Sequence, residues 1–344
     1  MYFPFPQFPP SSNQFNLVVD VEQQRSYGIY VLYEVNRNMN GKRIVIVHCG
    51  AGGKLPSSVE RRLVRLVKKA FEAGVGDGHN DRFANIARVL EDSPLTNTGY
   101  GSNICSDGTV RCDSSVVQCT PRGMKMGSVV CNSSRYPMED ALSVMNESLR
   151  VSKEGIVSPM VKVGDLVPDP QLVSKLQQNV YERAGDTIGV LLFEEVDKEW
   201  IITTGSSSGG NIMRDWRRIG SAGIPGSGCW TETMDFDEGG TNVVSIMVSG
   251  QGEELIKRDF ARYISKNMLK YINNEGMFVS DALEMSLNDM RRETRQLQWG
   301  VAGLAVIDGR PIGFFRGNSR SFVVGGSNSR VRLVQNSGYG EILL

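Results

Sequence analysis

The stretch Gly185-Asp186-Thr187-Ile188-Gly189 lies near the middle of the 344-residue chain. An internal threonine is a weak nucleophile, whereas a threonine with a free α-amine can pass its hydroxyl proton to that amine. A free α-amine has a reference pKa of roughly 7.7–8, so it can act as a base near neutral pH. The stretch therefore predicts that the chain cuts itself between Asp186 and Thr187, and that Thr187 becomes the nucleophile.

The sequence on either side of this stretch supports such a cut. Residues 168–185 are polar and contain two prolines, so we expect an exposed segment that suits cleavage. Residues 188–193 and 200–204 are rich in β-branched and aromatic side chains, which predicts two strands joined by a polar turn. A strand that begins beside Thr187 would hold the new N-terminus on a rigid element.

The wider pattern predicts strands and helices in alternating groups. Short apolar runs indicate strands, and apolar residues at helical spacing indicate helices. Strands are expected at about 43–47, 110–113, 126–131, 160–163, 188–193, 200–204, 243–248, 301–307, 311–316 and 321–324, and helices at 59–73, 81–90, 137–150, 253–268 and 280–298. Residues 48–53 and 226–230 are expected to be glycine-rich loops. Hairpins outnumber strand–helix–strand units, which favours antiparallel sheets with helices packed outside.

Charge and composition exclude several classes of function. Lys+Arg and Asp+Glu number 38 each, which argues against nucleic acid or an anionic membrane as the main partner. Residues 1–16 lack a basic start and an apolar segment, so we expect no secretory signal. Six cysteines without a C-x-x-C pair then predict reduced thiols in an intracellular protein, cytoplasmic or nuclear. Only two histidines, His48 and His79, are present, so a multi-histidine metal site is nearly excluded.

Several other segments accompany Thr187 and together form a specific pattern. They are VHCGAG (47–52), LEDSPLTNTGYGS (90–102), GTVRCD (108–113), GDTIG (185–189), SSGG (207–210), RIG (218–220), GCW (228–230) and SGQGE (249–253). In this combination the chain resembles the threonine-dependent N-terminal-nucleophile hydrolases. This family includes plant-type asparaginases, glycosylasparaginases and the threonine aspartases (taspases), and the resemblance is greatest to the last group.

The resemblance implies a fold and a processing scheme. The fold would be an α+β, four-layer αββα sandwich with two mainly antiparallel sheets between helical layers. Residues 1–40 would be an N-terminal arm and lead-in, 41–186 the α-subunit part and 187–344 the β-subunit part of one domain. The two subunits would come from one precursor, and relatives suggest a dimer of such heterodimers.

The resemblance also implies roles for individual residues. Thr187 would be the nucleophile and its freed amine the base, and Ser208 would orient the hydroxyl. Ser249 and the backbone N–H of Gly250 match the oxyanion-hole position. The substrate-binding residues would be Asn97, Arg218, Ser221 and Gly252, with Arg218 holding a substrate carboxylate. Relatives hold a sodium ion in the loop that corresponds to residues 48–58, although nothing in the residues themselves requires a metal or another cofactor.

One position separates the subfamilies. In asparaginases and glycosylasparaginases the arginine motif continues R-[VI]-G-D, and the aspartate binds the free α-amine of a single amino acid. Here Ser221 stands at that position. Leaving an ammonium group unpaired costs a few kcal/mol, which favours a peptide substrate whose α-nitrogen is an uncharged amide. We therefore expect a threonine endopeptidase that cuts proteins after aspartate. The alternatives are an L-asparaginase or isoaspartyl peptidase, and a non-catalytic, uncleaved homologue.

Overall fold

The computed structural model describes residues 42–52, 56–153, 161–163, 186–196, 199–236, 240–291, 298–319, 321–326, 332–334 and 339–342. These residues belong to one compact unit, Leu32–Leu344. The expected N-terminal arm (1–40) and the expected exposed segment (168–185) lie outside the described residues, and so does part of the expected sodium loop (53–55).

The larger sheet carries the Thr187 region. Its strands are β1 (Lys42–Gly52), β2 (Cys112–Thr120), β3 (Gly123–Asn132), β4 (Val161–Val163), β5 (Ile188–Val196), β6 (Glu199–Ser208), β11 (Ser321–Gly326) and β12 (Arg332–Val334). Their order across the sheet is β12-β11-β1-β5-β6-β2-β3-β4. Neighbours pair antiparallel, except for the parallel pair β3 and β4. The strand that follows Thr187 is therefore central, with a partner on each side.

The smaller sheet is wholly antiparallel. Its strands are β7 (Cys229–Phe236), β8 (Gly240–Gly250), β9 (Trp299–Ile307), β10 (Arg310–Gly317) and β13 (Tyr339–Ile342). They lie in the order β13-β10-β9-β8-β7 and pair antiparallel throughout.

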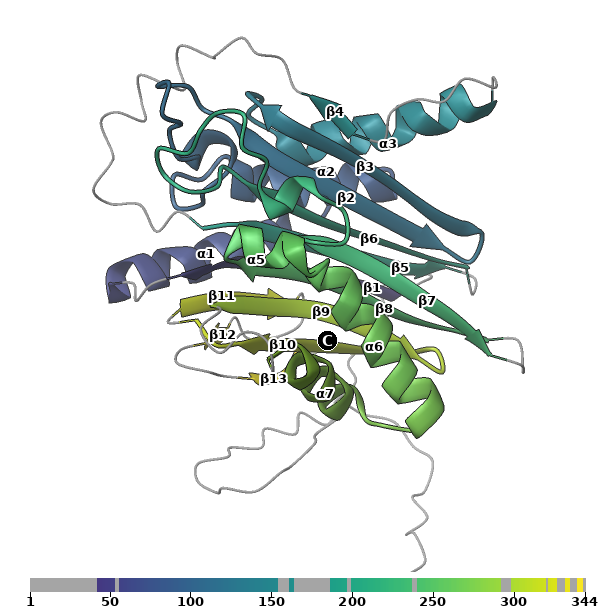
Figure 1. The fold of residues 1–344 in the computed structure, drawn as a ribbon. Coiled ribbons are helices and arrows are strands. Elements are labelled where there is room, and N and C mark those ends of the chain that lie inside the picture. Colours follow the sequence, from purple (N-terminus) through teal and green to yellow (C-terminus); the bar gives the residue numbers. More distant parts are fainter. Residues whose placement is uncertain are drawn as a thin grey trace, which may run out of the picture. The chain divides into compact units, whose positions relative to one another are not determined.

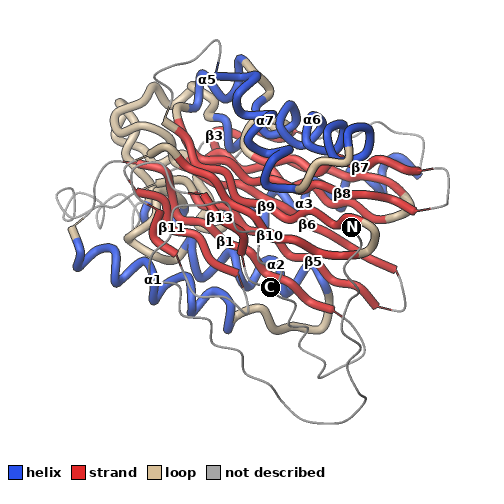
Figure 2. The backbone as a smooth tube through the Cα atoms, turned by 90° about the horizontal axis from the view of Figure 1, so that it is seen from below, coloured by secondary structure: helices blue, strands red, loops and turns tan. Residues whose placement is uncertain are grey.

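Helices cover the outer face of each sheet. The helices are α1 (Ser57–Glu72), α2 (His79–Glu91), α3 (Pro137–Lys153), α5 (Gly252–Lys257), α6 (Phe260–Glu275) and α7 (Val279–Arg291). Figures 1 and 2 show α6 and α7 on one side of the strands and α1 and α2 on the other. The expected four-layer αββα arrangement is confirmed.

Alternation along β5 shows how the layers are held together. Val190 and Leu192 pack with α1, α2 and α3 in one apolar cluster. Leu191 and Phe193 pack between the two sheets, against residues such as Met247 of β8. A third cluster joins the smaller sheet to α5, α6 and α7. Successive residues of a strand point to opposite faces, so a continuous apolar run is what a strand buried on both faces requires.

Three expectations about local structure were wrong. Residues 48–52 are not a loop, because β1 continues to Gly52 and pairs with both β5 and β11. Residues 229–230 begin strand β7 rather than lying in a loop. The single helix expected at 253–268 is divided into α5 and α6, where Asp259 adopts a left-handed conformation with φ of 48°. Glycine content suggested loops at the first two sites, whereas pairing with distant strands decided the outcome.

Within the described residues, none of the helices is both long enough and apolar enough to cross a membrane.

Candidate active site

Thr187 and Ser208 lie opposite each other at the ends of two neighbouring strands. β5 begins at Ile188 and β6 ends at Ser208, and the register pairs Ile188 with Ser207. The Thr187 hydroxyl donates a hydrogen bond to Ser208 Oγ at 3.0 Å. Ser208 Oγ also accepts the backbone N–H of Gly210 at 3.1 Å. The register of the sheet therefore brings the predicted nucleophile and its predicted orienting residue together.

Backbone hydrogen bonds from two distant segments hold the carbonyl groups of Asp186 and Thr187. The carbonyl oxygen of Asp186 accepts the N–H of Asn97 at 2.9 Å, and the carbonyl oxygen of Thr187 accepts the N–H of Gly50 at 2.7 Å. Attack by the Thr187 hydroxyl would place negative charge on the Asp186 carbonyl oxygen. A donor already aimed at that oxygen is the arrangement that lowers the barrier of such a step.

Asn97 connects the loops around the predicted scissile bond. Its side-chain oxygen accepts the N–H of Asn103 at 2.8 Å, and its side-chain nitrogen donates to the carbonyl of Gly210 at 2.7 Å. Its own carbonyl accepts the N–H of Gly209 at 2.6 Å. These bonds fix the loop of residues 93–103 against the end of β6. Asn97 is therefore near the predicted scissile bond through its backbone, while its side chain is engaged with the protein.

The carboxyl group of Asp186 lies against β1 where Gly50 forms a bulge. Gly50 has a φ of 69°, and a Cβ atom built there would lie 2.0 Å from Cβ of Asp186. Burial raises the pKa of Asp186 to about 7, opposed by the Thr187 N–H that donates to it. That N–H···Oδ1 distance is 3.3 Å. Near neutral pH this carboxyl can therefore either accept or release a proton next to the predicted cleavage site.

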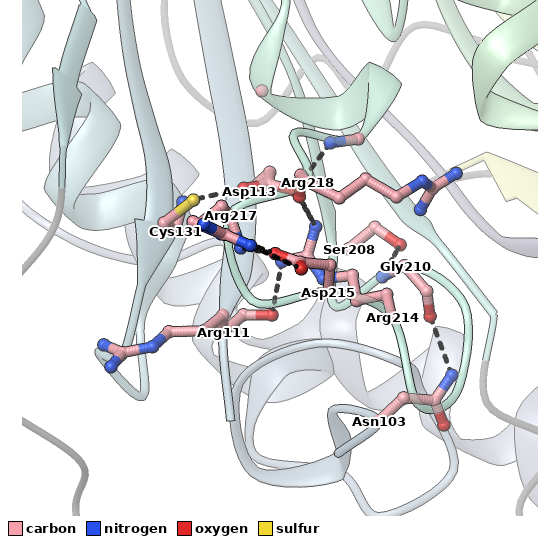
Figure 3. Close-up of polar contacts among 12 residues, drawn as sticks. Asn103, Arg111, Asp113, Cys131, Ser208, Gly210, Arg214, Asp215, Arg217 and Arg218 are labelled. Atoms are coloured by element: carbon pink, nitrogen blue, oxygen red, sulfur yellow. Dashed lines mark hydrogen bonds and ion pairs between the residues drawn. The ribbon is translucent and has the colours of Figure 1, made fainter. Parts of the chain in front are cut away.

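A buried ion pair holds the loop that carries Arg218. Arg214 Nη1 contacts Asp113 Oδ2 at 2.5 Å, and both side chains are almost fully buried. Arg214 also donates to the carbonyl of Arg218 at 2.6 Å and to that of Arg111 at 2.8 Å. Asp113 in turn accepts the N–H of Gly220 at 2.8 Å. Figure 3 shows this cluster, with the side chain of Arg218 extending away from the Asp113–Arg214 pair.

Three of the four predicted substrate-binding residues gather at the start of helix α5, apart from Asn97. A Cβ atom built on Gly252 would lie 3.6 Å from Oγ of Ser221 and 3.8 Å from Nη2 of Arg218. Ser221 begins a short 3-10 helix, Ser221–Gly223. Arg218 donates from Nε to Oε1 of Glu253 at 2.8 Å, and its Nη2 contacts the same oxygen. Arg218, Ser221 and Gly252 are therefore brought together, with Glu253 as an additional acidic neighbour.

Ser249 and Gly250 end strand β8 just before this cluster. Ser249 is buried, and Gly250 has a φ of 159°. A Cβ atom on Gly250 would lie 2.6 Å from the carbonyl oxygen of Gln298, so glycine is required there. The N–H of the preceding Val248 donates to the carbonyl of Gly228 at 2.8 Å. The role of Ser249 and Gly250 in an oxyanion hole stays a prediction.

Four contributors to the site were not expected. They are the backbone N–H groups of Gly50 and Asn97, the Asp113–Arg214 pair, and Glu253. Gly50, Asp113 and Glu253 lie inside three of the segments that carry the family resemblance, VHCGAG, GTVRCD and SGQGE. Membership in these segments is the sequence signal that could have identified them. Arg214 lies outside all of them and carried no such signal.

The described residues contain no group of three or more His, Cys, Asp or Glu side chains that could hold a metal ion. A sodium ion near residues 48–58 stays a prediction. Residues 48–52 of that segment are part of strand β1, and their backbone is engaged in pairing.

Comparison with known proteins agrees with this geometry. Residues 162–310 match the family model described as asparaginase. The chain is 22% identical over 284 residues to an isoaspartyl peptidase/L-asparaginase of Macaca fascicularis, covering 77% of this chain and 86% of that protein. It is 23% identical over 304 residues to a plant-type L-asparaginase of Pyrobaculum calidifontis, covering 82% and 95%. It is 26% identical over 297 residues to an isoaspartyl peptidase of Salmonella typhimurium, covering 78% and 89%.

The matched segment contains Thr187, Ser208, Arg218 and Ser249, and the two sheets between helical layers agree with the sandwich of the N-terminal-nucleophile hydrolases. Over residues 162–310 the chain is thus similar to the asparaginase family.

Proposed function

We propose that this protein is a self-processing threonine endopeptidase that hydrolyses polypeptides after aspartate. The observation that carries the proposal is the pair of hydrogen bonds at the predicted cleavage site. Thr187 Oγ1 donates to Ser208 at 3.0 Å, while the N–H of Asn97 donates to the Asp186 carbonyl at 2.9 Å. Nucleophile and carbonyl are thus each engaged by a separate group, as attack on that carbonyl requires.

In the processing step, the Thr187 hydroxyl adds to the carbonyl carbon of Asp186. The bond from that carbon to the Thr187 nitrogen then breaks, which leaves an ester on Oγ1 and a free α-amine. Water hydrolyses the ester and returns the hydroxyl to Thr187. In the mature enzyme the freed amine accepts the hydroxyl proton, and the same sequence of ester formation and hydrolysis acts on a substrate.

The choice of a polypeptide substrate rests on position 221. A single amino acid carries a charged ammonium group that needs an acidic partner, whereas a peptide nitrogen does not. Ser221 offers a hydroxyl where the asparaginase pattern has a carboxylate. Arg218 remains as a fork for the aspartate side chain of the substrate. We also propose that the subunits stay associated after cleavage and that the protein acts inside the cell.

The second candidate is an isoaspartyl peptidase or L-asparaginase acting on small amides. The names of the similar proteins from Macaca fascicularis and Salmonella typhimurium favour it. Glu253 beside Arg218 is also a carboxylate within this cluster, although it is engaged by the guanidinium.

One experiment separates the candidates. The purified chain is first tested by intact mass and N-terminal sequencing for a fragment that begins at Thr187. It is then incubated with a peptide containing an internal aspartate, with a β-aspartyl dipeptide and with L-asparagine. We expect cleavage after aspartate in the peptide alone, and Ser221→Asp should increase activity on the small substrates. Turnover of only the small substrates by the unaltered protein would establish the second candidate, and a chain that stays intact and inactive would be a non-catalytic homologue.

A further inference from the structure

The guanidinium predicted to bind substrate is already occupied by a side chain of the protein. Arg218 directs Nε and Nη2 to the same oxygen of Glu253, with an Nε···Oε1 distance of 2.8 Å. These two groups form one of the edges through which an arginine binds a carboxylate in bidentate fashion. A substrate carboxylate that approaches this edge must therefore replace Glu253.

The surroundings of the pair allow that replacement. The side chain of Glu253 is 58% exposed, whereas that of Arg218 is 25% exposed. Gly252, which precedes Glu253, leaves the space beside Nη2 free of a side chain. The hydrogen bonds from Arg218 lower the pKa of Glu253, so it is ionised near neutral pH. A carboxylate with this exposure can turn into water, while the more buried guanidinium keeps its place.

We infer that Glu253 is a specificity-determining residue that occupies Arg218 until the side-chain carboxylate of a substrate aspartate displaces it. The inference rests on the proposed function of Arg218. Exposed ion pairs are weak, so the displacement lowers substrate affinity by a modest factor rather than preventing binding. Glu253 selects for ligands with a carboxylate, because a neutral side chain cannot replace it on the guanidinium.

The neighbouring residue provides a matched control. Glu254 lies on the same helix but contacts Lys257 at 2.8 Å and Arg258 at 3.2 Å. Glu254→Gln therefore removes the same charge from the same turn without removing the carboxylate that contacts Arg218. A change in ligand affinity that comes only from the loss of one negative charge would therefore appear in both Glu253→Gln and Glu254→Gln.

The experiment compares the unaltered full chain with these two variants. Calorimetry measures the Kd of N-acetyl-L-aspartate N-methylamide, which presents only the side-chain carboxylate, and of the corresponding asparagine derivative. Kinetics measure KM and kcat for a peptide with an internal aspartate and for a β-aspartyl dipeptide. For Glu253→Gln we expect Kd and KM for the aspartate ligands to fall by about two- to fivefold, with kcat unchanged. For Glu254→Gln we expect no change in Kd or KM.

Each outcome decides the inference. An unchanged or raised Kd for the aspartate derivative in Glu253→Gln, or an equal fall in Glu254→Gln, overturns it. If the unaltered protein cleaves the β-aspartyl dipeptide, loss of that activity in Glu253→Gln also overturns the inference, because Glu253 would then bind a substrate ammonium group. A tighter Kd in a protein that does not cleave after aspartate upholds the role of Glu253 while refuting the proposed endopeptidase function.

Discussion

The carboxyl group of Asp186 allows a quantitative test of how the uncleaved chain is held together. Burial against β1 raises its pKa from 3.8 to about 7. Between these two values the folded chain keeps the carboxyl protonated, whereas the unfolded chain has released the proton. The contribution of this carboxyl to the free energy of unfolding is therefore fully present below about pH 4 and is lost as the pH rises through about 7.

The perturbation is Asp186→Asn in a Thr187→Ala background, which keeps the chain intact. With the two pKa values above, the aspartate should lose about 2.5 kcal/mol of stability between pH 5 and pH 8 relative to the neutral asparagine. The difference between the two proteins isolates this group, because every other titrating group is common to both. Asparagine has nearly the same shape, so packing against Gly50 is retained.

The assay is urea unfolding of both proteins at several pH values, followed by circular dichroism. The advantage of Asp186→Asn should grow from pH 5 to about pH 7 and level off above that folded-state pKa. A difference that stays within about 0.5 kcal/mol over this range would show that the carboxyl is ionised and solvated, and the argument from burial would fail.

Three further substitutions test the rest of the site. Ser208→Ala removes the acceptor of the Thr187 hydroxyl and should slow conversion of the intact chain into fragments, measured by electrophoresis, by about ten- to a hundredfold, with recovery in Ser208→Thr. Gly50→Ala would place a Cβ 2.0 Å from Asp186 and should destabilise the intact chain by about 2–4 kcal/mol in urea unfolding, against about 1 kcal/mol for the unobstructed Gly108→Ala. Asp113→Asn leaves Arg214 buried without its ionic partner, so the free energy of unfolding should fall by about 3–5 kcal/mol and KM for an aspartate peptide should rise. A fall in the free energy of unfolding of less than about 1 kcal/mol would contradict this reasoning.

Much of the fold could be predicted from the sequence because its signals are local. Runs of β-branched and aromatic residues located the two strands that follow Thr187, and helical spacing located α1, α2 and α3 to within a few residues. The change from a polar segment to a buried strand at Asp186-Thr187 also marked the predicted nucleophile. In each case the determining property, the side-chain period or the position of a turn former, belongs to consecutive residues.

Tertiary structure alone decided how distant segments meet at the site. The N–H groups of Gly50 and Asn97 reach the Thr187 and Asp186 carbonyls, and Glu253 occupies Arg218. Backbone donors have no side-chain signature, and the pairing of an arginine with one of many acidic residues depends on the path of the chain between them. The sequence by itself determined which residue is the predicted nucleophile, whereas only the assembled sheets decided which groups hold its carbonyl and cover its substrate-binding arginine.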